Sequence, residues 1–132
     1  MPGTFQCIVV TPEAPILDHP VKHAVIPAWD GRIGLLPSHA PLLVKLGFGP
    51  ISLDLEDNSR KMLFIGGGFA QMKDEVLTIL TDEALDPNQI NRTEVAAAFR
   101  EAEARQPTSN QEANRRQRDL ERARGLLAVA PQ

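Results

Sequence analysis

Hydrophobic residues along this chain follow two different periods, and the change comes near residue 85. Before that point, short apolar runs recur between turn-forming residues, at positions 5–10, 21–26, 51–55, 62–65, 69–72 and 76–80. After it, apolar side chains recur every three to four residues among charged ones, which is the period of a helix lying against a surface. The pattern therefore predicts several short strands followed by helices.

The run at 51–55 illustrates the β character of the first part. Apolar residues occupy positions 51, 53 and 55 and polar residues the positions between them, as in a strand with one face in the core and one in water. The turn-forming Asp57, Asn58 and Ser59 lead into the next apolar run, so the two runs predict a hairpin. Many short strands in about eighty residues favour a β-sandwich or a flattened barrel.

Residues 90–95 carry the signals of a helix start. Asn91 and Glu94 have the spacing of a capping box, and Ile90 and Val95 are placed to form a hydrophobic staple around it. A first helix is therefore expected from Asn91. Its narrow apolar stripe consists of Val95, Phe99 and Ala102.

The polar segment at 107–110 is expected to end this helix, and a second helix follows from about residue 111 to residue 127. Its apolar side consists of Ala113, Leu120, Ala123 and Leu127. Gly125 is expected to weaken the last turns, because glycine is a poor helix former. The alanine-rich stripes bury little area. The two helices therefore predict a hairpin that is only marginally stable alone, and movable.

Glycine and proline mark the same division of the chain. Only Gly125 among the nine glycines lies beyond Gly68, and residues 82–89 form an acidic, proline-containing stretch typical of a linker. We predict a mostly β plus α protein. It has an N-terminal β-sandwich or flattened barrel at residues 1–84, a linker at 85–90 and a C-terminal two-helix antiparallel hairpin at 91–132.

The composition narrows the classes of function. With 132 residues and a formal net charge of -3, the chain lacks the basic surplus of a nucleic-acid-binding domain. The single cysteine, Cys7, lies in an apolar run and is expected to be a small core residue. No run approaches the roughly eighteen apolar residues of a membrane span, and no signal peptide is apparent. We expect a soluble protein that reaches a membrane only through a partner.

No catalytic, metal or cofactor site is expected. His19 and His23 lie on a run with strand character, and no cysteine or acidic cluster completes a set of metal ligands. His39 lies between two prolines, where a hydrogen bond to the backbone accounts for it. A small hydrolase or isomerase that uses His39 with Asp30 or Asp18 is an alternative, but it lacks a convincing third group.

The most distinctive stretch runs from Asp30 to Leu43 and reads DGRIGLLPSHAPLL. Its two glycines and two prolines restrict the backbone, so it predicts one rigid surface. It is followed by a glycine run before Phe69 and by the segment VLTILTD, which starts at Val76. Together these motifs resemble the epsilon subunit of F-type ATP synthases, called delta in mitochondria, over the first two thirds of the chain. That family has glutamate where this chain has Arg32.

The resemblance implies a non-catalytic subunit of the central stalk that couples ion movement to ATP synthesis. It implies a sandwich that contacts the gamma subunit and the ring of c subunits, on the cytoplasmic face of a bacterial inner membrane. The rotor contacts carried over by position are Gly31, Arg32, Ile33, Gly34, His39 and Pro41. The alternative from another class is a free-standing β-sandwich adaptor that binds a protein partner.

The second helix carries more arginine than acid. Five arginines and three acidic residues lie between positions 112 and 124, and this surplus favours an acidic partner. The resemblance implies that an extended hairpin contacts an acidic loop of a beta subunit in the catalytic head and impedes ATP hydrolysis. The residues assigned to this inhibitory contact are Arg115, Arg116, Arg118 and Arg122.

Some members of the family bind ATP through the motif I/L-D-x-x-R-A at the start of the first helix. The corresponding window here is residues 90–95, where Asn91 replaces the aspartate, Glu94 the arginine and Val95 the alanine. An anion stands where a phosphate requires a cation. ATP is therefore not expected to bind by this route.

Overall fold

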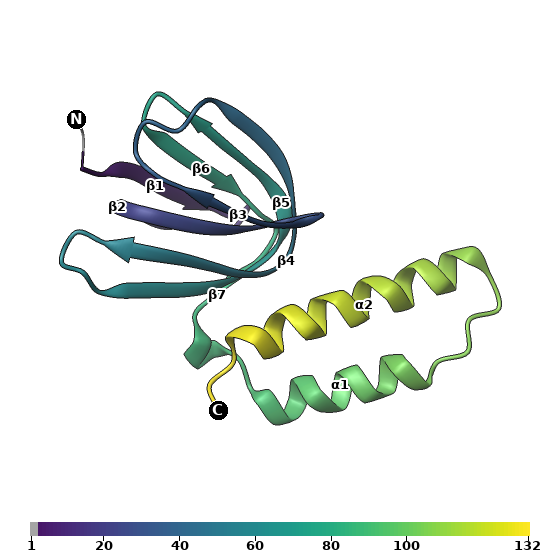
Figure 1. Cartoon of the computed structure of the whole chain (residues 1–132). Helices are drawn as coiled ribbons and strands as arrows, with labels where there is room; N and C mark the ends of the chain where they lie inside the picture. Colours follow the sequence, from purple (N-terminus) through teal and green to yellow (C-terminus); the bar gives the residue numbers. More distant parts are fainter. Residues whose placement is uncertain (1–2) are drawn as a thin grey trace.

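The strands in the first two thirds of the chain form one sheet that closes on itself. The computed structural model describes residues 3–132. The strands are β1 (Phe5–Val10), β2 (Pro15–Ala28), β3 (Gly31–Leu35), β4 (Leu42–Leu55), β5 (Arg60–Lys73), β6 (Val76–Leu80) and β7 (Ala84–Leu85). Neighbouring strands follow the order β1-β6-β5-β4-β2-β3, and β1 also pairs with β2. The sheet therefore closes into the flattened barrel that the sequence predicts (Figure 1).

The longest hairpin joins β4 and β5. Its register is unbroken from the pair Leu42 and Met72 to the pair Asp54 and Arg60, and Asn58 adopts the left-handed conformation in the turn, with φ of 69°. The predicted hairpin is confirmed, and its strands are longer than their apolar runs, with 14 residues each. Both strands curve strongly, so this one hairpin contributes to a large part of the barrel wall (Figure 1).

Gly68 allows β5 and β6 to approach each other closely. Its φ is +104°, and a Cβ atom there would lie 2.0 Å from the carbonyl oxygen of Leu80. A side chain at this position would therefore push the strands apart. The glycine run at 66–68 is part of β5 and not a phosphate-binding loop.

The inner faces of the strands enclose the main hydrophobic core. Its largest fully buried side chains include Phe5, Ile26, Leu35, Ile51, Leu53, Leu63, Ile65 and Met72. Cys7 lies among them without exposed surface, and desolvation raises the pKa of its thiol to about 12. Such a thiol stays protonated at neutral pH. Cys7 is thus a small core residue, as predicted.

Two capped helices follow the barrel after the single turn η1 (Pro87–Gln89); they are α1 (Arg92–Ala104) and α2 (Asn110–Val129). The Asn91 side chain caps α1 by accepting a hydrogen bond from the Glu94 amide at 3.0 Å. Ser109 caps α2 by accepting one from the Glu112 amide at 3.1 Å. Both predicted helices are confirmed, and α2 begins one residue earlier and ends two residues later than expected.

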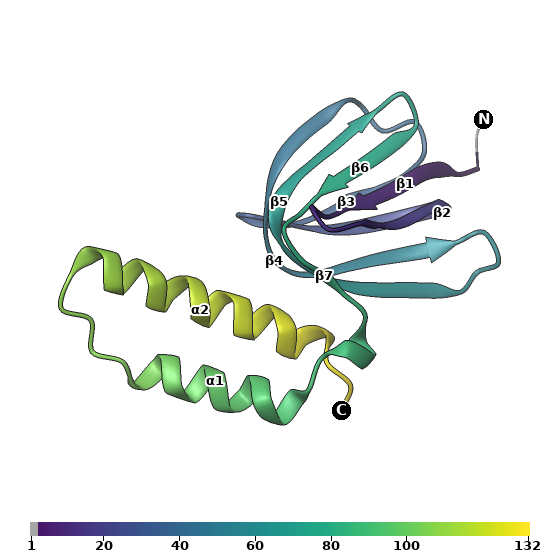
Figure 2. The same cartoon turned by 180° about the vertical axis from the view of Figure 1, so that it is seen from behind.

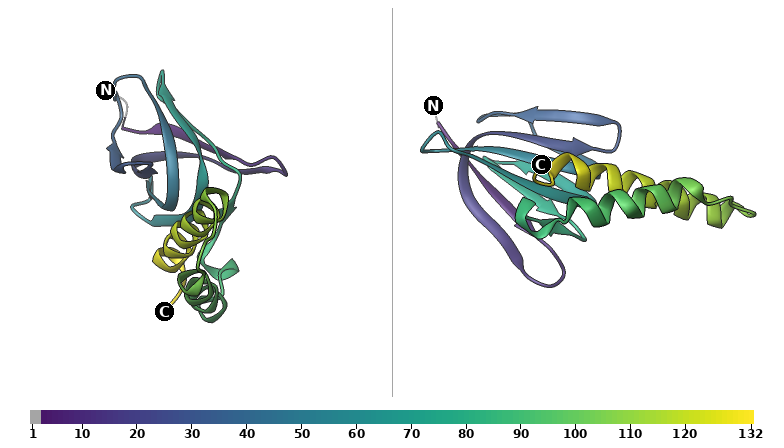
Figure 3. Two further views of the ribbon diagram at one scale, coloured as in Figure 1. Left: turned by 90° about the vertical axis from the view of Figure 1, so that its right-hand side faces the viewer. Right: turned by 90° about the horizontal axis from the view of Figure 1, so that it is seen from below.

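The hairpin lies against the barrel through the second half of α2. This helix packs against β4 and β5, while the turn between the helices points away from the barrel (Figure 2, Figure 3). The buried residues of α2 are Leu120, Ala123, Gly125, Leu126 and Val129. Ala113, on the predicted apolar side, is exposed. The first half of α2 lies beyond the barrel, where little covers it.

A second, smaller hydrophobic cluster joins the hairpin to the barrel. Its buried members are Phe64, Ile90, Leu126, Val129 and Ala130. Phe64 comes from β5 and has no exposed surface, because it lies under the end of α2 and not in the main core. Removal of the hairpin would uncover this side chain.

Gly125 marks a close contact between α2 and the barrel. A Cβ atom there would lie 2.8 Å from the carbonyl carbon of Phe48 and 3.0 Å from the amide nitrogen of Gly49. Both are backbone atoms, which cannot move aside cheaply. The sequence indicates only a weak point in the helix, whereas the structure shows a position where the absence of a side chain permits docking.

The connection between the two parts is short and partly structured. β7 pairs with β5 through Ala84 and Leu85, so it crosses the predicted division between residues 84 and 85. The turn η1 lies inside the predicted linker at 85–90. The second hydrophobic cluster spans this connection, since it contains residues of the barrel and of the hairpin. The independence of residues 1–84 and 91–132 stays a prediction.

Candidate functional site

The stretch from residue 30 to residue 43 comprises a turn, a strand and a loop. Residues 29–30 form the turn between β2 and β3, and β3 pairs with β2. Residues 36–41 form a separate connection to β4, which we call the contact loop. A five-residue strand thus separates the turn from the loop, and the single rigid surface stays a prediction.

The residues assigned to rotor contacts fall in both places. Those on β3 are Gly31, Arg32, Ile33 and Gly34, and those in or beside the contact loop are His39 and Pro41. All are exposed except Ile33, which is half-buried. Nδ1 of His39 lies 2.7 Å from the carbonyl oxygen of Ala40, so the predicted hydrogen bond to the backbone is present. The exposure of these residues suits contact with a partner, which stays a prediction.

Large apolar side chains are exposed along the same motif. Trp29, in the turn before β3, is 67% exposed, and Leu36 and Leu43, at either end of the contact loop, are 59% and 72% exposed. Leu36 and Leu43 flank the contact loop and make it a candidate surface for a partner, whereas Trp29 lies at the other end of β3. The contact loop lies at the end of the barrel away from the helical hairpin (Figure 1, Figure 2).

A second apolar surface lies on the outer side of β5 and β6. Phe69 and Leu80 are cross-strand partners, and they are 54% and 55% exposed. Together with Thr11 and Pro12 they line a shallow hollow of about 380 Å³. We call Phe69 and Leu80 the β5–β6 patch.

Sequence reasoning missed this patch, although a signal was present. Phe69 shares its strand phase with Gln71 and Lys73, which are exposed, while Ala70 and Met72 in the opposite phase are buried. A large apolar residue in the polar phase of a strand indicates a surface covered by something else.

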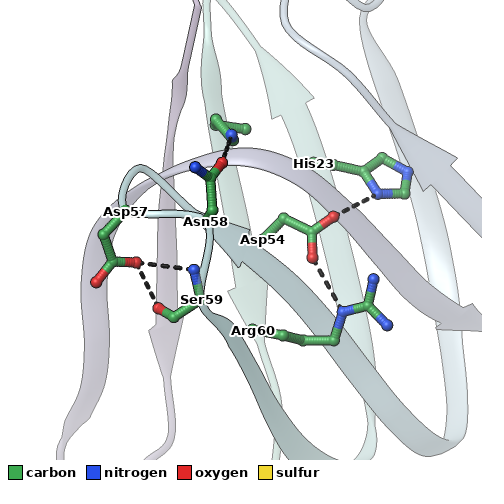
Figure 4. A network of polar contacts seen from close by, with 7 residues as sticks. His23, Asp54, Asp57, Asn58, Ser59 and Arg60 are labelled. Atoms are coloured by element: carbon green, nitrogen blue, oxygen red, sulfur yellow. Dashed lines mark hydrogen bonds and ion pairs between the residues drawn. The ribbon is translucent and has the colours of Figure 1, made fainter.

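A polar network ties β2, β4 and β5 together near the β4–β5 turn (Figure 4). The Asp54 carboxylate lies 3.0 Å from Nε of Arg60 and 3.3 Å from Nδ1 of His23. The hydrogen bond from Arg60, assisted by the one from His23, lowers the pKa of Asp54. Asp57 accepts a hydrogen bond from the Ser59 amide at 2.9 Å within the turn. The network stabilises the hairpin and fixes its turn.

Within this network, Ser59 bonds to Asp57 and not to His23. Among the residues that the structure describes, neither Asp30 nor Asp18 hydrogen-bonds to His39, whose Nδ1 faces the Ala40 carbonyl, while Asp18 bonds to Gln6. Residues 3–132 also contain no group of three or more histidine, cysteine and acidic side chains that could hold a metal ion.

The four arginines assigned to the inhibitory contact differ in their surroundings. Arg122 donates to both oxygens of the Glu83 carboxylate, at 2.9 and 2.6 Å, and this pairing raises the pKa of Arg122. Arg116 donates to the carbonyl oxygen of Glu103 at 3.1 Å. Arg115 and Arg118 are exposed. In the docked hairpin, Arg122 and Arg116 therefore also make contacts within the chain.

Arg92 joins the two ends of the hairpin, and the sequence analysis did not single it out. Its guanidinium donates to the carbonyl oxygens of Leu127, Pro131 and Ala130 at 2.9, 3.0 and 3.1 Å. Carbonyl groups at a helix C-terminus lack partners within the helix and carry partial negative charge. Arg92 satisfies this end of α2 from the start of α1.

A cavity of about 380 Å³ lies between the two helices and the segment that precedes them, next to the window at 90–95. Glu94, Asp119, Arg105 and Arg122 contribute to its lining. Arg105 is paired with Asp119 at 2.7 Å and Arg122 with Glu83 at 2.6 Å. Both cations are thus already neutralised by protein groups. The absence of ATP binding stays a prediction.

Comparison with known families gives the decisive observation. Residues 4–87 match the family described as "ATP synthase, Delta/Epsilon chain, beta-sandwich domain". The chain belongs to the ATP synthase delta/epsilon family. A member from Rippkaea orientalis, named ATP synthase epsilon chain, is 34% identical over 131 residues, which is 96% of each chain. One of the same name from Granulibacter bethesdensis is 38% identical over 96 residues, or 73% of this chain and 71% of that one.

The fold of the whole chain agrees with membership of the ATP synthase delta/epsilon family. A chain in the cryo-EM structure of the Euglena gracilis mitochondrial ATP synthase, OSCP/F1/c-ring, superposes with a TM-score of 0.89 and 27% identity. The superposition covers 97% of this chain and 82% of that chain. None of the helices within residues 3–132 is long and apolar enough to cross a membrane.

Proposed function

We propose that this chain is a non-catalytic rotor subunit of an F-type ATP synthase, where it transmits torque between the c-ring and the gamma subunit. The observation that carries the proposal is the pair of exposed apolar surfaces on a barrel of the delta/epsilon family. One is the contact loop, with Leu36 and Leu43 at its ends, and the other is the β5–β6 patch. Leu43 pairs with Gln71 of β5, so the two surfaces adjoin. A rotor subunit needs two partners, and two such surfaces suit two partners.

The contact loop is the better candidate for the c-ring. It lies at the end of the barrel away from the hairpin (Figure 1), and a hairpin that reaches the catalytic head must lie on the side remote from the ring. The β5–β6 patch lies on the barrel wall and is assigned to the gamma subunit. In this arrangement the chain is peripheral to the membrane, on the cytoplasmic face of a bacterial inner membrane.

Mixing the purified chain with the gamma subunit of its ATP synthase tests this function. We expect one complex in gel filtration, formed by the full chain and also by a fragment of residues 1–86 that keeps β7 whole. The fragment is expected to bind because neither apolar surface includes the hairpin. Failure of the full chain to bind gamma would favour the adaptor alternative. Failure of the fragment alone would contradict the two-part architecture.

We also propose that the hairpin, when released from the barrel, restrains ATP hydrolysis through its arginines. In the docked structure, Arg122 holds α2 to Glu83, whereas Arg115 and Arg118 are exposed to solvent. Positive charge on an extended α2 would attract an acidic loop on a beta subunit. Arg122 stabilises the docked hairpin through Glu83 and would also contact the beta subunit from the extended hairpin. Its substitution would therefore affect both states.

Two sets of substitutions should change hydrolysis in opposite directions. The double change Arg115→Ala with Arg118→Ala removes cations without touching the docked contacts, and it should raise ATP hydrolysis of the assembled enzyme by a few-fold. Each exposed charge contributes about 0 to 1 kcal/mol, so single changes should have little effect. Glu83→Gln weakens the tie to Arg122 while keeping every arginine, and it should lower hydrolysis. The same direction of change in both variants would refute the model.

A further inference from the structure

Glu75, in the turn between β5 and β6, is an unusual residue for the backbone conformation that it adopts. Asp74 and Glu75 both adopt the left-handed conformation, with φ of 52° and 63°, as in the two-residue turns that favour asparagine and glycine. A glutamate gains nothing from this conformation, and a strained backbone residue costs on the order of 1 kcal/mol. The turn alone therefore does not explain Glu75.

The side chain of Glu75 reaches the contact loop. Its Oε1 accepts a hydrogen bond from the backbone amide of Ser38 at 2.6 Å, and hydrogen bonds to an ionised acceptor are stronger than neutral ones. Ser38 is itself in the left-handed conformation, with φ of 66°. The carbonyl oxygen of Glu75 also accepts from the Gln6 amide at 2.9 Å. Glu75 thus connects the contact loop to β1 and to the β5–β6 turn.

The carboxylate has a further local cost. Its second oxygen, Oε2, is buried and has no hydrogen-bond partner among residues 3–132, and an unsatisfied buried acceptor is unfavourable. The left-handed conformations of Glu75 and Ser38 and one unsatisfied oxygen therefore accompany a single contact, the hydrogen bond between these two residues. Local costs of this kind are characteristic of functional positions.

We infer that Glu75 is a positioning residue that fixes the contact loop against the barrel for binding to the c-ring. The loop has its own internal support, a hydrogen bond from the His39 amide to the Leu36 carbonyl at 3.2 Å and two flanking prolines. These features define its shape, whereas Glu75 defines its place on the barrel. A loop held in place before binding loses less entropy when the partner binds. This inference rests on the proposed function.

The substitution Glu75→Asn separates the two roles of this position. Asparagine suits the left-handed backbone but is too short to reach Ser38. We expect a melting temperature equal to or above that of the unmodified chain. Hydrogen exchange of the Ser38 amide, followed by NMR, should become at least tenfold faster. Affinity for a c-ring–gamma assembly should fall several-fold. Glu75→Gln keeps the reach of the side chain without its charge, and it should give intermediate exchange.

Asp74→Asn provides the matched control, because it changes the neighbouring left-handed residue of the same turn. It should leave both Ser38 exchange and assembly unchanged. Unchanged Ser38 exchange in Glu75→Asn would overturn the positioning role itself, whatever the assembly does. Faster exchange with unchanged assembly would refute the assignment of the contact loop to the c-ring, and with it that part of the proposed function.

Discussion

Replacement of Gly125 by alanine is expected to release the helical hairpin from the barrel while making α2 itself a better helix. The new methyl group would lie 2.8 Å from the carbonyl carbon of Phe48 and 2.9 Å from its oxygen. Overpacking of this kind costs about 1 to 3 kcal/mol, which lowers the equilibrium constant for docking of the hairpin roughly five- to 150-fold. In the free helix, alanine is favoured over glycine by about 1 kcal/mol. The substitution therefore acts on docking and helix stability in opposite directions.

Distances between spin labels can measure this release. Labels at the exposed positions Glu56 and Gln111 would report on the hairpin relative to the barrel, and Cys7 can remain because it is buried. We expect a broad, longer distance distribution in Gly125→Ala and a single narrow one in the unmodified chain.

The control is Ala128→Gly, which lowers helix propensity by a similar amount at an exposed position of the same helix. This variant should keep the narrow distribution. A docked hairpin in Gly125→Ala would show that the helix can shift along the barrel, and that the close contact does not govern docking.

The double change Phe69→Ser with Leu80→Ser is expected to abolish tight binding of the gamma subunit without unfolding the barrel. Both side chains are more than half exposed, so the free chain loses little core packing. If gamma covers them, their burial contributes roughly 1 to 2 kcal/mol each, from the area that becomes buried. The dissociation constant should therefore rise by about thirty- to thousandfold, since each 1.4 kcal/mol is a factor of ten. Isothermal titration with gamma provides the measurement.

Leu36→Ser is the matched control for this experiment. Leu36 is 59% exposed and lies in the contact loop, outside the paired residues of β4, β5 and β6. It should leave gamma binding nearly unchanged. If the Leu36 variant loses as much affinity as the double variant, gamma occupies the contact loop as well. If the double variant binds normally, the β5–β6 patch serves another partner.

The sequence by itself was sufficient to predict local structure and the family. Alternation around residues 51–55 predicts the β4–β5 hairpin, and the capping spacing of Asn91 and Glu94 predicts where α1 begins. Both signals depend on residues close in the chain, through strand period and side-chain caps. The motif between Asp30 and Leu43 carries the family resemblance, and its glycines and prolines indicate a restricted backbone.

Only the tertiary structure decided how distant residues meet. Arg122 forms an ion pair with Glu83, which lies between β6 and β7. Glu75 accepts a hydrogen bond from the amide of Ser38, 37 positions away. From the sequence, Gly125 only lowers the stability of its helix. In the structure, its lack of a side chain allows α2 to pack against the backbone of Phe48. Such contacts join segments that no local period relates, because they depend on how the barrel closes and where the hairpin lies against it.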